Sequence, residues 1–105
     1  MTKKNTRTRP GAPAAVVVVR IPGPLRELSG GAAEVPASGR TVRAVLDDLV
    51  ARHPRLRRHL RREGGGLREH VNVYVNEEDV RFLRGEKTPV SDGDALTLVA
   101  SIAGG

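Results

Sequence analysis

Hydrophobic positions in the first third of the chain form continuous runs instead of spaced patterns. The run AAVVVVRI at 14–21 is rich in β-branched residues, which is typical of a strand buried on both faces. Residues 25–31 (LRELSGG) are expected to form a loop or hairpin turn. Residues 32–37 (AAEVPA) predict a weaker returning strand, and Pro36 suits the edge of a sheet.

The next stretch has the spacing of an amphipathic helix. Its apolar positions recur at i, i+3, i+4, i+7 and i+8 and form one stripe: Val42, Val45, Leu46, Leu49 and Val50. Thr41 is the predicted N-cap, and Pro54 is expected to end the helix because the residue before a proline avoids the α region. A second, short helix is predicted over 55–63, with Leu56 and Leu60 facing the core.

The last third of the chain alternates between apolar and polar residues. Residues 69–80 predict a strand that runs into a turn at 76–79 (NEED), and 80–83 (VRFL) predict a further short strand. The sequence SDGD at 91–94 is a strong turn signal before a final strand at 95–101. The side chains expected to face inward are Val71, Val73, Val75, Leu96, Leu98 and Ala100.

This order of elements predicts an α+β fold with one small sheet. The first and last strands are the most apolar, so we place them side by side and parallel at the sheet centre. The helix at 42–51 then packs across one face. This is the β-grasp, or ubiquitin-like, layout: a mixed sheet of four to five strands with one main crossing helix. We expect a disordered basic tail at 1–14, a β-grasp domain at 15–101 and a flexible tail at 102–105.

Length and composition limit the chemistry that the chain could perform. A chain of 105 residues suits one domain with a modest core, so we expect a carrier or binding module and no catalytic residues of its own. The absence of cysteine excludes disulfides, Cys-ligated metal sites and a thiol nucleophile. His53, His59 and His70 lack a zinc-like spacing, and we expect no metal. No run approaches transmembrane length, and no signal-peptide pattern is present, so we expect a cytoplasmic protein.

The net charge of +6 is unevenly distributed. Segment 52–62 (RHPRLRRHLRR) holds six arginines and no acid, and a helix there would place Arg57 with Arg61 on one basic face. Like charges at that spacing destabilise a helix, and the segment has no aromatic platform for stacking on nucleic acid. A solvated basic face is the favoured interpretation. Docking on an acidic partner and nucleic-acid binding through Arg52–Arg62 are the alternatives.

The chain finishes on a bare Gly-Gly directly after the predicted last strand. Glycine has no Cβ, so Gly104 and Gly105 can lie extended in a narrow channel. The combination of VNVYVNEEDVRF at 71–82 with SDGDALTLVASIAGG at 91–105 resembles the sulfur-carrier proteins of the ThiS/MoaD family. The resemblance runs from about residue 15 to 105. It is strongest to the actinobacterial branch that supplies sulfur for cysteine synthesis.

The resemblance implies a chemical role for the chain end. An E1-like activating enzyme of the MoeB/ThiF type would use ATP to adenylate Gly105, and a sulfur donor would convert it to a thiocarboxylate. Ala103 and Gly104 would thread the tail into partner sites. The acceptor would be a synthase, PLP-dependent in the cysteine branch, with ATP and PLP bound by the partners and not by this chain. Thiazole, molybdopterin and sulfur-containing secondary metabolites are the other pathways implied.

Docking residues are suggested from the usual binding surface of β-grasp modifiers, the apolar outer face of the sheet. We suggest Phe82, Leu83 and Ile102 with Arg81 for this role, although Phe82 fits a core position equally well. We expect a monomer that binds neither membrane nor nucleic acid. The alternative within the same fold is a ubiquitin-like modifier joined to lysines through Gly105.

Overall fold

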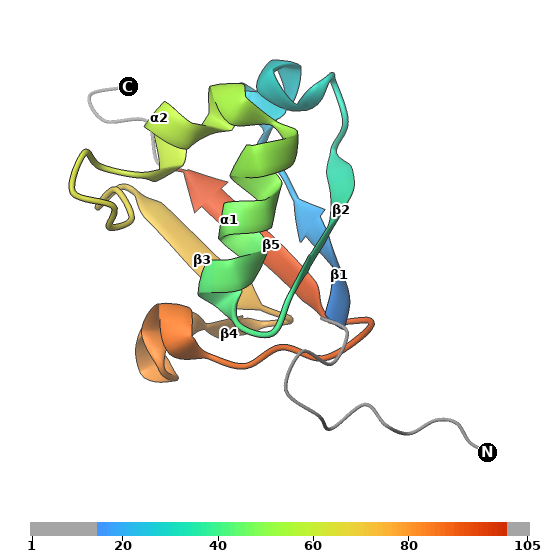
Figure 1. Ribbon diagram of the computed structural model, residues 1–105, viewed down its shortest axis with the longest axis vertical. Helices are drawn as coiled ribbons and strands as arrows, with labels where there is room; N and C mark the ends of the chain where they lie inside the picture. The colour runs from blue at the N-terminus through green and yellow to red at the C-terminus, as the bar shows by residue number, and fades with distance from the viewer. Residues whose placement is uncertain (1–14, 101–105) are drawn as a thin grey trace.

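The computed structural model of the protein describes residues 15–100. Five strands form one mixed sheet in the order β2-β1-β5-β3-β4, and the main helix crosses one face of it (Figure 1). The strands are β1 (Ala15–Arg20), β2 (Glu34–Gly39), β3 (Val71–Val75), β4 (Glu78–Asp79) and β5 (Ala95–Ala100). β1 and β5 lie side by side and parallel, while β2 pairs with β1, and β3 with β5, in antiparallel fashion. The predicted β-grasp layout is confirmed.

Short helical elements connect the strands. The α-helices are α1 (Val42–Arg52) and α2 (Arg57–Leu60), and the 3-10 helices are η2 (Gly23–Ser29), η3 (Pro54–Leu56), η4 (Val80–Phe82) and η5 (Gly85–Lys87). None of the helices in residues 15–100 is long and apolar enough to cross a membrane.

Helix α1 forms where the apolar spacing predicts it. The Thr41 hydroxyl accepts a hydrogen bond from the Ala44 N–H at 3.2 Å, which satisfies one of the free donors of the first turn. The helix ends at Arg52, two residues before Pro54. Four residues of its stripe are buried against the inner face of the sheet, namely Val42, Val45, Leu46 and Leu49. Val50 is partly buried and packs beside them.

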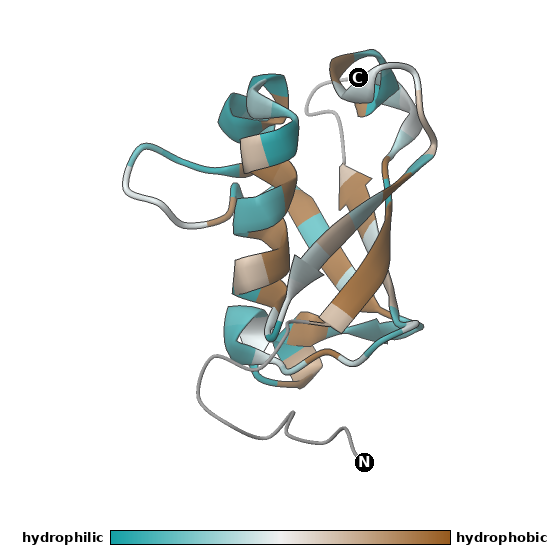
Figure 2. Cartoon of the chain, turned by 45° about the vertical axis from the view of Figure 1, so that its right-hand side comes forward, coloured by the Kyte–Doolittle hydropathy of each residue, from teal (hydrophilic) through white to brown (hydrophobic). Residues whose placement is uncertain are grey.

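β1 differs from the prediction that it is buried on both faces. Val17 and Val19 are buried, whereas Val16 is 54% and Val18 is 39% exposed. Helix α1 packs along one side of the sheet, and no helix of residues 15–100 lies over the other side of β1 (Figure 2). A continuous valine run carries no period, so its composition cannot show that one face stays open.

The connection from β1 to β2 was predicted only in part. Residues 23–29 form the 3-10 helix η2 instead of a loop or hairpin turn. The chain reverses at Gly30 and Gly31, whose φ angles of +75° and +86° favour glycine. β2 begins at Glu34, later than expected, and lies at the sheet edge, where Pro36 is tolerated.

Two further segments differ from the prediction, one in type and one in length. Residues 80–83 are not a strand: Val80–Phe82 form η4, because the Asp79 carboxylate accepts from the Arg81 N–H and caps a turn there. The second helix is also shorter than the predicted 55–63. It is one α-turn, α2, after η3, although Leu56 and Leu60 are fully buried as expected.

Candidate functional site

β5 carries the chain toward its Gly-Gly end through the middle of the sheet. β1 flanks it on one side and β3 on the other, with Val71 opposite Ala100 in the register. The predicted inward positions Leu96 and Leu98 are buried, so the strand is anchored along its length. The tail residues Ile102, Ala103, Gly104 and Gly105, on which the predicted chemistry depends, lie outside the described residues.

A polar turn network fixes the start of β5. The Asn76 side chain accepts from the Ala95 N–H at 3.1 Å and donates to the Asp94 carboxylate at 3.2 Å. Asp94 also accepts from the Ser91 N–H at 2.8 Å, and Asp92 accepts from the Val16 N–H at 2.7 Å. The turn 91–94, in which Gly93 has a φ of +87°, is therefore confirmed, and its carboxylates position β5 beside β1.

The outer face of the sheet, opposite α1, presents apolar side chains from its two central strands. Val99 of β5 is 41% exposed on the same face as Val16 and Val18 of β1. Tyr74 of β3 pairs with Thr97 in the register and extends this face toward β4. These positions were missed in the choice of docking residues. For Val99 the alternation with the buried Leu96 and Leu98 was a signal, whereas the valine run of β1 has no period that separates Val16 and Val18 from their buried neighbours.

The predicted docking residues lie beside this outer face, at the β4 edge. Phe82 is 83% exposed, so it is not a core residue, and Leu83 is also exposed. Both line a shallow hollow of about 470 Å³ together with Tyr74. The structure therefore brings Phe82, Leu83 and Arg81 to one surface that adjoins Tyr74.

Arg81 is held over a carboxylate on that surface. Its Nη2 lies 2.7 Å from the Asp79 Oδ2, and its backbone N–H donates to the Asp79 Oδ1 at 2.8 Å. The side-chain hydrogen bond from Arg81 holds the pKa of Asp79 below its ordinary value, and the same bond raises the pKa of Arg81. The pair makes Arg81 a neutralised part of the surface.

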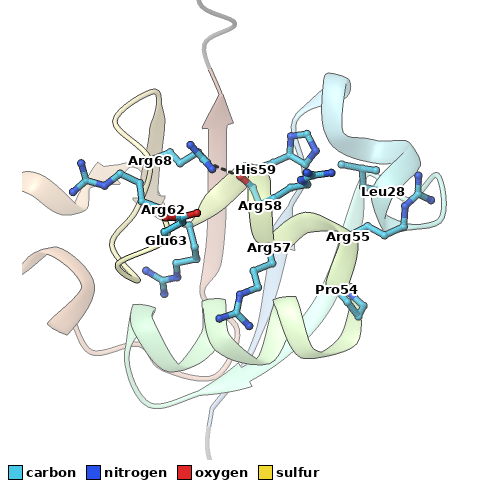
Figure 3. A pocket seen from close by; sticks show the side chains of 10 residues that line it. Leu28, Pro54, Arg55, Arg57, Arg58, His59, Arg62, Glu63 and Arg68 are labelled. Atoms are coloured by element: carbon cyan, nitrogen blue, oxygen red, sulfur yellow. Dashed lines mark hydrogen bonds between the residues drawn. The ribbon is translucent and has the colours of Figure 1, made fainter.

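A second, larger hollow lies over α2 and the loop after it (Figure 3). It has a volume of about 690 Å³ and contains the side chain of His59. We call it the arginine hollow after the five exposed or half-buried arginines that line it: Arg55, Arg57, Arg58, Arg62 and Arg68.

Arg61 departs from the predicted basic helical face. α2 ends at Leu60, and Arg61 is extended, so it does not share a helix face with Arg57. Its side chain is only 8% exposed and reaches the Glu86 carboxylate at 2.7 Å, the Asp47 carboxylate at 3.5 Å and the Gly65 carbonyl at 3.1 Å. One of the six arginines thus ties α1, η5 and the loop after α2 together.

Within residues 15–100, no group of three or more His, Cys, Asp or Glu side chains is arranged to hold a metal ion. His59 lines the arginine hollow, and His53 caps the C-terminal end of α1 with its backbone N–H bonded to the Leu49 carbonyl at 2.8 Å.

Comparison with known proteins shows what this arrangement is similar to. Residues 19–105 match the sequence model of the ThiS family. The chain is 44% identical over 91 residues to the sulfur carrier protein CysO of Mycobacterium tuberculosis, and the match covers 85% of this chain and 98% of that protein.

Solved structures give the same result for the fold. The chain resembles a structure of the Amycolatopsis orientalis BexX/CysO complex, with a TM-score of 0.77 and 45% identity over 85% of this chain and 99% of that one. It also resembles the small archaeal modifier protein 1 of Methanosarcina acetivorans, with a TM-score of 0.80 and 30% identity over 88% of this chain and 98% of that one.

Proposed function

The chain belongs to the ThiS family, and on this basis we propose that it carries sulfur as a thiocarboxylate on Gly105. The similarity to a sulfur carrier protein over nearly that protein's whole length is the observation that supports the proposal most directly. The match to the family extends to residue 105 and so includes the Gly-Gly. The chain itself would act as a protein co-substrate, not as an enzyme.

A carboxylate is a poor electrophile, so the Gly105 carboxylate must be activated before sulfur can be added to it. An E1-like enzyme would join the Gly105 carboxylate to the AMP part of ATP and release pyrophosphate. A sulfur donor would then attack the acyl carbon, and AMP would leave, which yields the thiocarboxylate. This group is ionised and polarisable at neutral pH, as thiolates are, and is therefore a good nucleophile. The chain has no cysteine, so the terminus is its one evident place to carry sulfur.

The fold supports this role by delivering the tail from a rigid strand. β5 is paired on both sides, and Ala100 at its end lies opposite Val71. Five further residues reach Gly105, so the carboxylate extends at most about 18 Å beyond the sheet. Glycines at 104 and 105 would let the tail enter a channel too narrow for side chains.

We assign the docking of the activating enzyme to the outer face of the sheet. Val16, Val18 and Val99 are apolar and exposed on this face, and Phe82 with Leu83 extends it at the β4 edge. Exposed apolar side chains gathered on one face of a sheet are typical of a protein-binding site. Compared with the docking residues expected from the sequence, this adds the three valines.

For the acceptor we propose an enzyme of cysteine synthesis. The support is the 44% identity to a CysO protein. A PLP-dependent synthase would bind the acceptor and the PLP, and this chain would present the thiocarboxylate and regain its free carboxylate after transfer. Thiazole, molybdopterin and sulfur-containing secondary metabolites remain the alternative destinations.

Intact-mass spectrometry tests the proposal. We would incubate the chain with an E1-like activating enzyme, ATP and a sulfur donor, beside a matched chain that lacks Gly105. The expected result is a mass gain equal to the exchange of one oxygen for sulfur, located on the C-terminal peptide and absent from the truncated chain. A gain that persists without Gly105 would contradict the proposal.

A covalent modifier is the second candidate, and the structural similarity to a small archaeal modifier protein supports it. In that case Gly105 would form an isopeptide bond with lysines of other proteins. Higher-mass conjugates in cell lysate that resist reducing agents and disappear with the Gly105 deletion would favour this candidate over transfer of sulfur to a small acceptor.

A further inference from the structure

The arginine hollow concentrates positive charge that the fold leaves uncompensated. Within residues 15–100, four other arginines each face a carboxylate: Arg20, Arg52, Arg61 and Arg81. None of the five arginines that define the hollow takes part in an ion pair there. Glu63 is the one acidic side chain among the described residues that line the hollow. Charges of one sign gathered in a concave surface focus the electric field and attract ligands of opposite sign.

The hollow adjoins the end of the strand that leads to Gly105. The Arg68 carbonyl accepts from the Val71 N–H at 3.0 Å, and Val71 lies opposite Ala100 in the sheet. The Arg68 side chain in turn donates to the Arg58 carbonyl, which ties α2 to the same end of the sheet. Figure 3 shows Arg62 and Arg68 near the arrowhead of β5.

This position places the hollow beside the point from which the tail leaves the sheet. Gly105 lies five residues beyond Ala100, so it extends at most about 18 Å from the end of β5. An active site that receives Gly105 therefore lies within about this distance of the β5 end. Enzyme side chains around the entrance to that active site are within reach of Arg62 and Arg68.

We propose that the arginine hollow binds an acidic surface, formed by Asp and Glu side chains, on the activating enzyme beside the entrance for the tail. The inference rests on the proposed function and adds a second contact to the apolar one. Guanidinium groups bind carboxylates through paired hydrogen bonds, and an exposed cluster of them steers an acidic partner during encounter.

The geometry favours a protein partner over nucleic acid. No Phe, Tyr or Trp side chain lines the hollow in the described part of the chain, and His59 is the one ring there on which a base could stack, whereas binding of single strands relies on a series of aromatic platforms. α2 comprises the four residues Arg57–Leu60, which is too short to present a recognition helix to the major groove. Arg61, which would complete a basic face, is committed to Glu86.

The test compares two triple variants of equal charge. The hollow variant carries Arg55→Ala, Arg57→Ala and Arg62→Ala. The control carries Arg40→Ala, Arg43→Ala and Arg84→Ala, three exposed arginines without an ion pair in the described residues and outside the hollow. Loading of Gly105 is followed by intact mass at several enzyme and salt concentrations, and thermal unfolding shows that each variant is folded.

At low salt the hollow variant is expected to load with kcat/KM about tenfold lower than wild type, within the range that electrostatic steering supplies. The difference should shrink as salt is added, because screening weakens the attraction. The control should stay within about threefold of wild type, and kcat at saturating carrier should be unchanged in both variants.

Equal loading of the two variants at low salt would overturn the inference while leaving the proposed function intact. Failure of the wild-type chain to load, with an enzyme that loads a related carrier, would instead contradict the proposed function. Tight, salt-dependent binding of a fluorescent DNA oligonucleotide that only the hollow variant loses, with loading unaffected, would assign the hollow to nucleic acid.

Discussion

β1 and the arginine segment 55–62 are both built from repeats of one residue type, and the fold divides each of them between two roles. In β1 the division is regular, since Val17 and Val19 are buried while Val16 and Val18 remain exposed. In the arginine segment it is irregular. Arg61 alone is buried and paired, and the arginines around it line an exposed hollow.

The difference lies in what decides the environment of each residue. In a strand, successive side chains point to opposite faces, so one covering layer is enough to sort the valines. In the arginine segment the partners come from elsewhere: Asp47 belongs to α1 and Glu86 to η5. Residue type alone therefore does not fix whether a side chain is buried or paired. In β1 the register of the strand sets the burial, and in the arginine segment the position of a distant carboxylate does.

The largest expected effect comes from placing a carboxylate on the buried face of β1. Val19→Asp would place a carboxylate in the aliphatic core, a cost comparable to the whole stability of a domain, about 5–15 kcal/mol. We expect this variant to be largely unfolded in circular dichroism and urea titrations. Val18→Asp, one position away, should stay within about 1 kcal/mol of wild type but load more slowly, because it places a charge on the outer face.

Equal stability of these two variants would remove the distinction between the faces of β1. Retention of full loading activity by Val18→Asp would leave the distinction intact but would separate the outer face from the docking of the activating enzyme.

An intermediate effect is expected from Arg61. Arg61→Ala would leave the Glu86 carboxylate without its partner and should lower the free energy of unfolding by about 3 kcal/mol, as the breaking of other buried pairs does. Arg62→Ala removes the same charge from an exposed position and should change it by about 0.5 kcal/mol or less. Urea unfolding of both proteins measures the difference. Similar losses would mean that Arg61 is no more structural than its neighbour.

The smallest expected effect is a pH-dependent change in stability, which distinguishes the hydrogen-bonded carboxylate of Asp48 from an exposed one. The Ser38 N–H donates to Asp48 at 2.8 Å, and this bond, helped by Arg52, holds the pKa of Asp48 below its ordinary value of 3.8. A depressed pKa in the folded state stabilises the protein above the unfolded pKa, and this contribution is lost as the pH falls through the folded one. Asp48→Asn should therefore destabilise the protein near neutral pH, and the difference from wild type should shrink below about pH 4.

Thermal unfolding across this pH range checks the Asp48 prediction. Glu69→Gln serves as the control, since Glu69 is exposed and makes no hydrogen bond or ion pair through its side chain within residues 15–100. A constant difference between Asp48→Asn and wild type from neutral pH to pH 3 would show that the charge of Asp48 contributes nothing.

Much of the fold could be predicted where the information is local and periodic. The apolar stripe of α1, its Thr41 cap and the inward valines of β3 were all confirmed. The segment 80–83 was predicted wrongly, because its apolar pattern suits a strand while the Arg81 N–H donates to the Asp79 carboxylate and caps the turn of η4 there. Phe82 was equally ambiguous, since an aromatic residue suits both a core and a binding surface, and the structure places it outside.

The candidate site shows the same division. Gly104 and Gly105 were recognised from sequence, and their role stays a prediction because they lie outside the described residues. The outer-face valines and the arginine hollow needed the structure. Their residues were visible in the sequence, but the exposure of the valines and the position of the hollow beside the end of β5 were not.

The helix, the apolar strands, the turn at 91–94 and the family of the chain follow from the amino-acid order alone, because these depend on spacing and on short motifs. Which valines face outward and which arginine is buried is settled by the packing of the folded chain. The close approach of α1 to β2 likewise requires glycine at position 39, since a Cβ there would lie 2.5 Å from the Val45 nitrogen. The exposure of the valines and the pairing of Arg61 depend on atoms brought together from distant parts of the chain, and local patterns carry no record of such contacts. The contact at Gly39 depends on the angle at which the chain turns from β2 into α1, which the spacing of residues does not show.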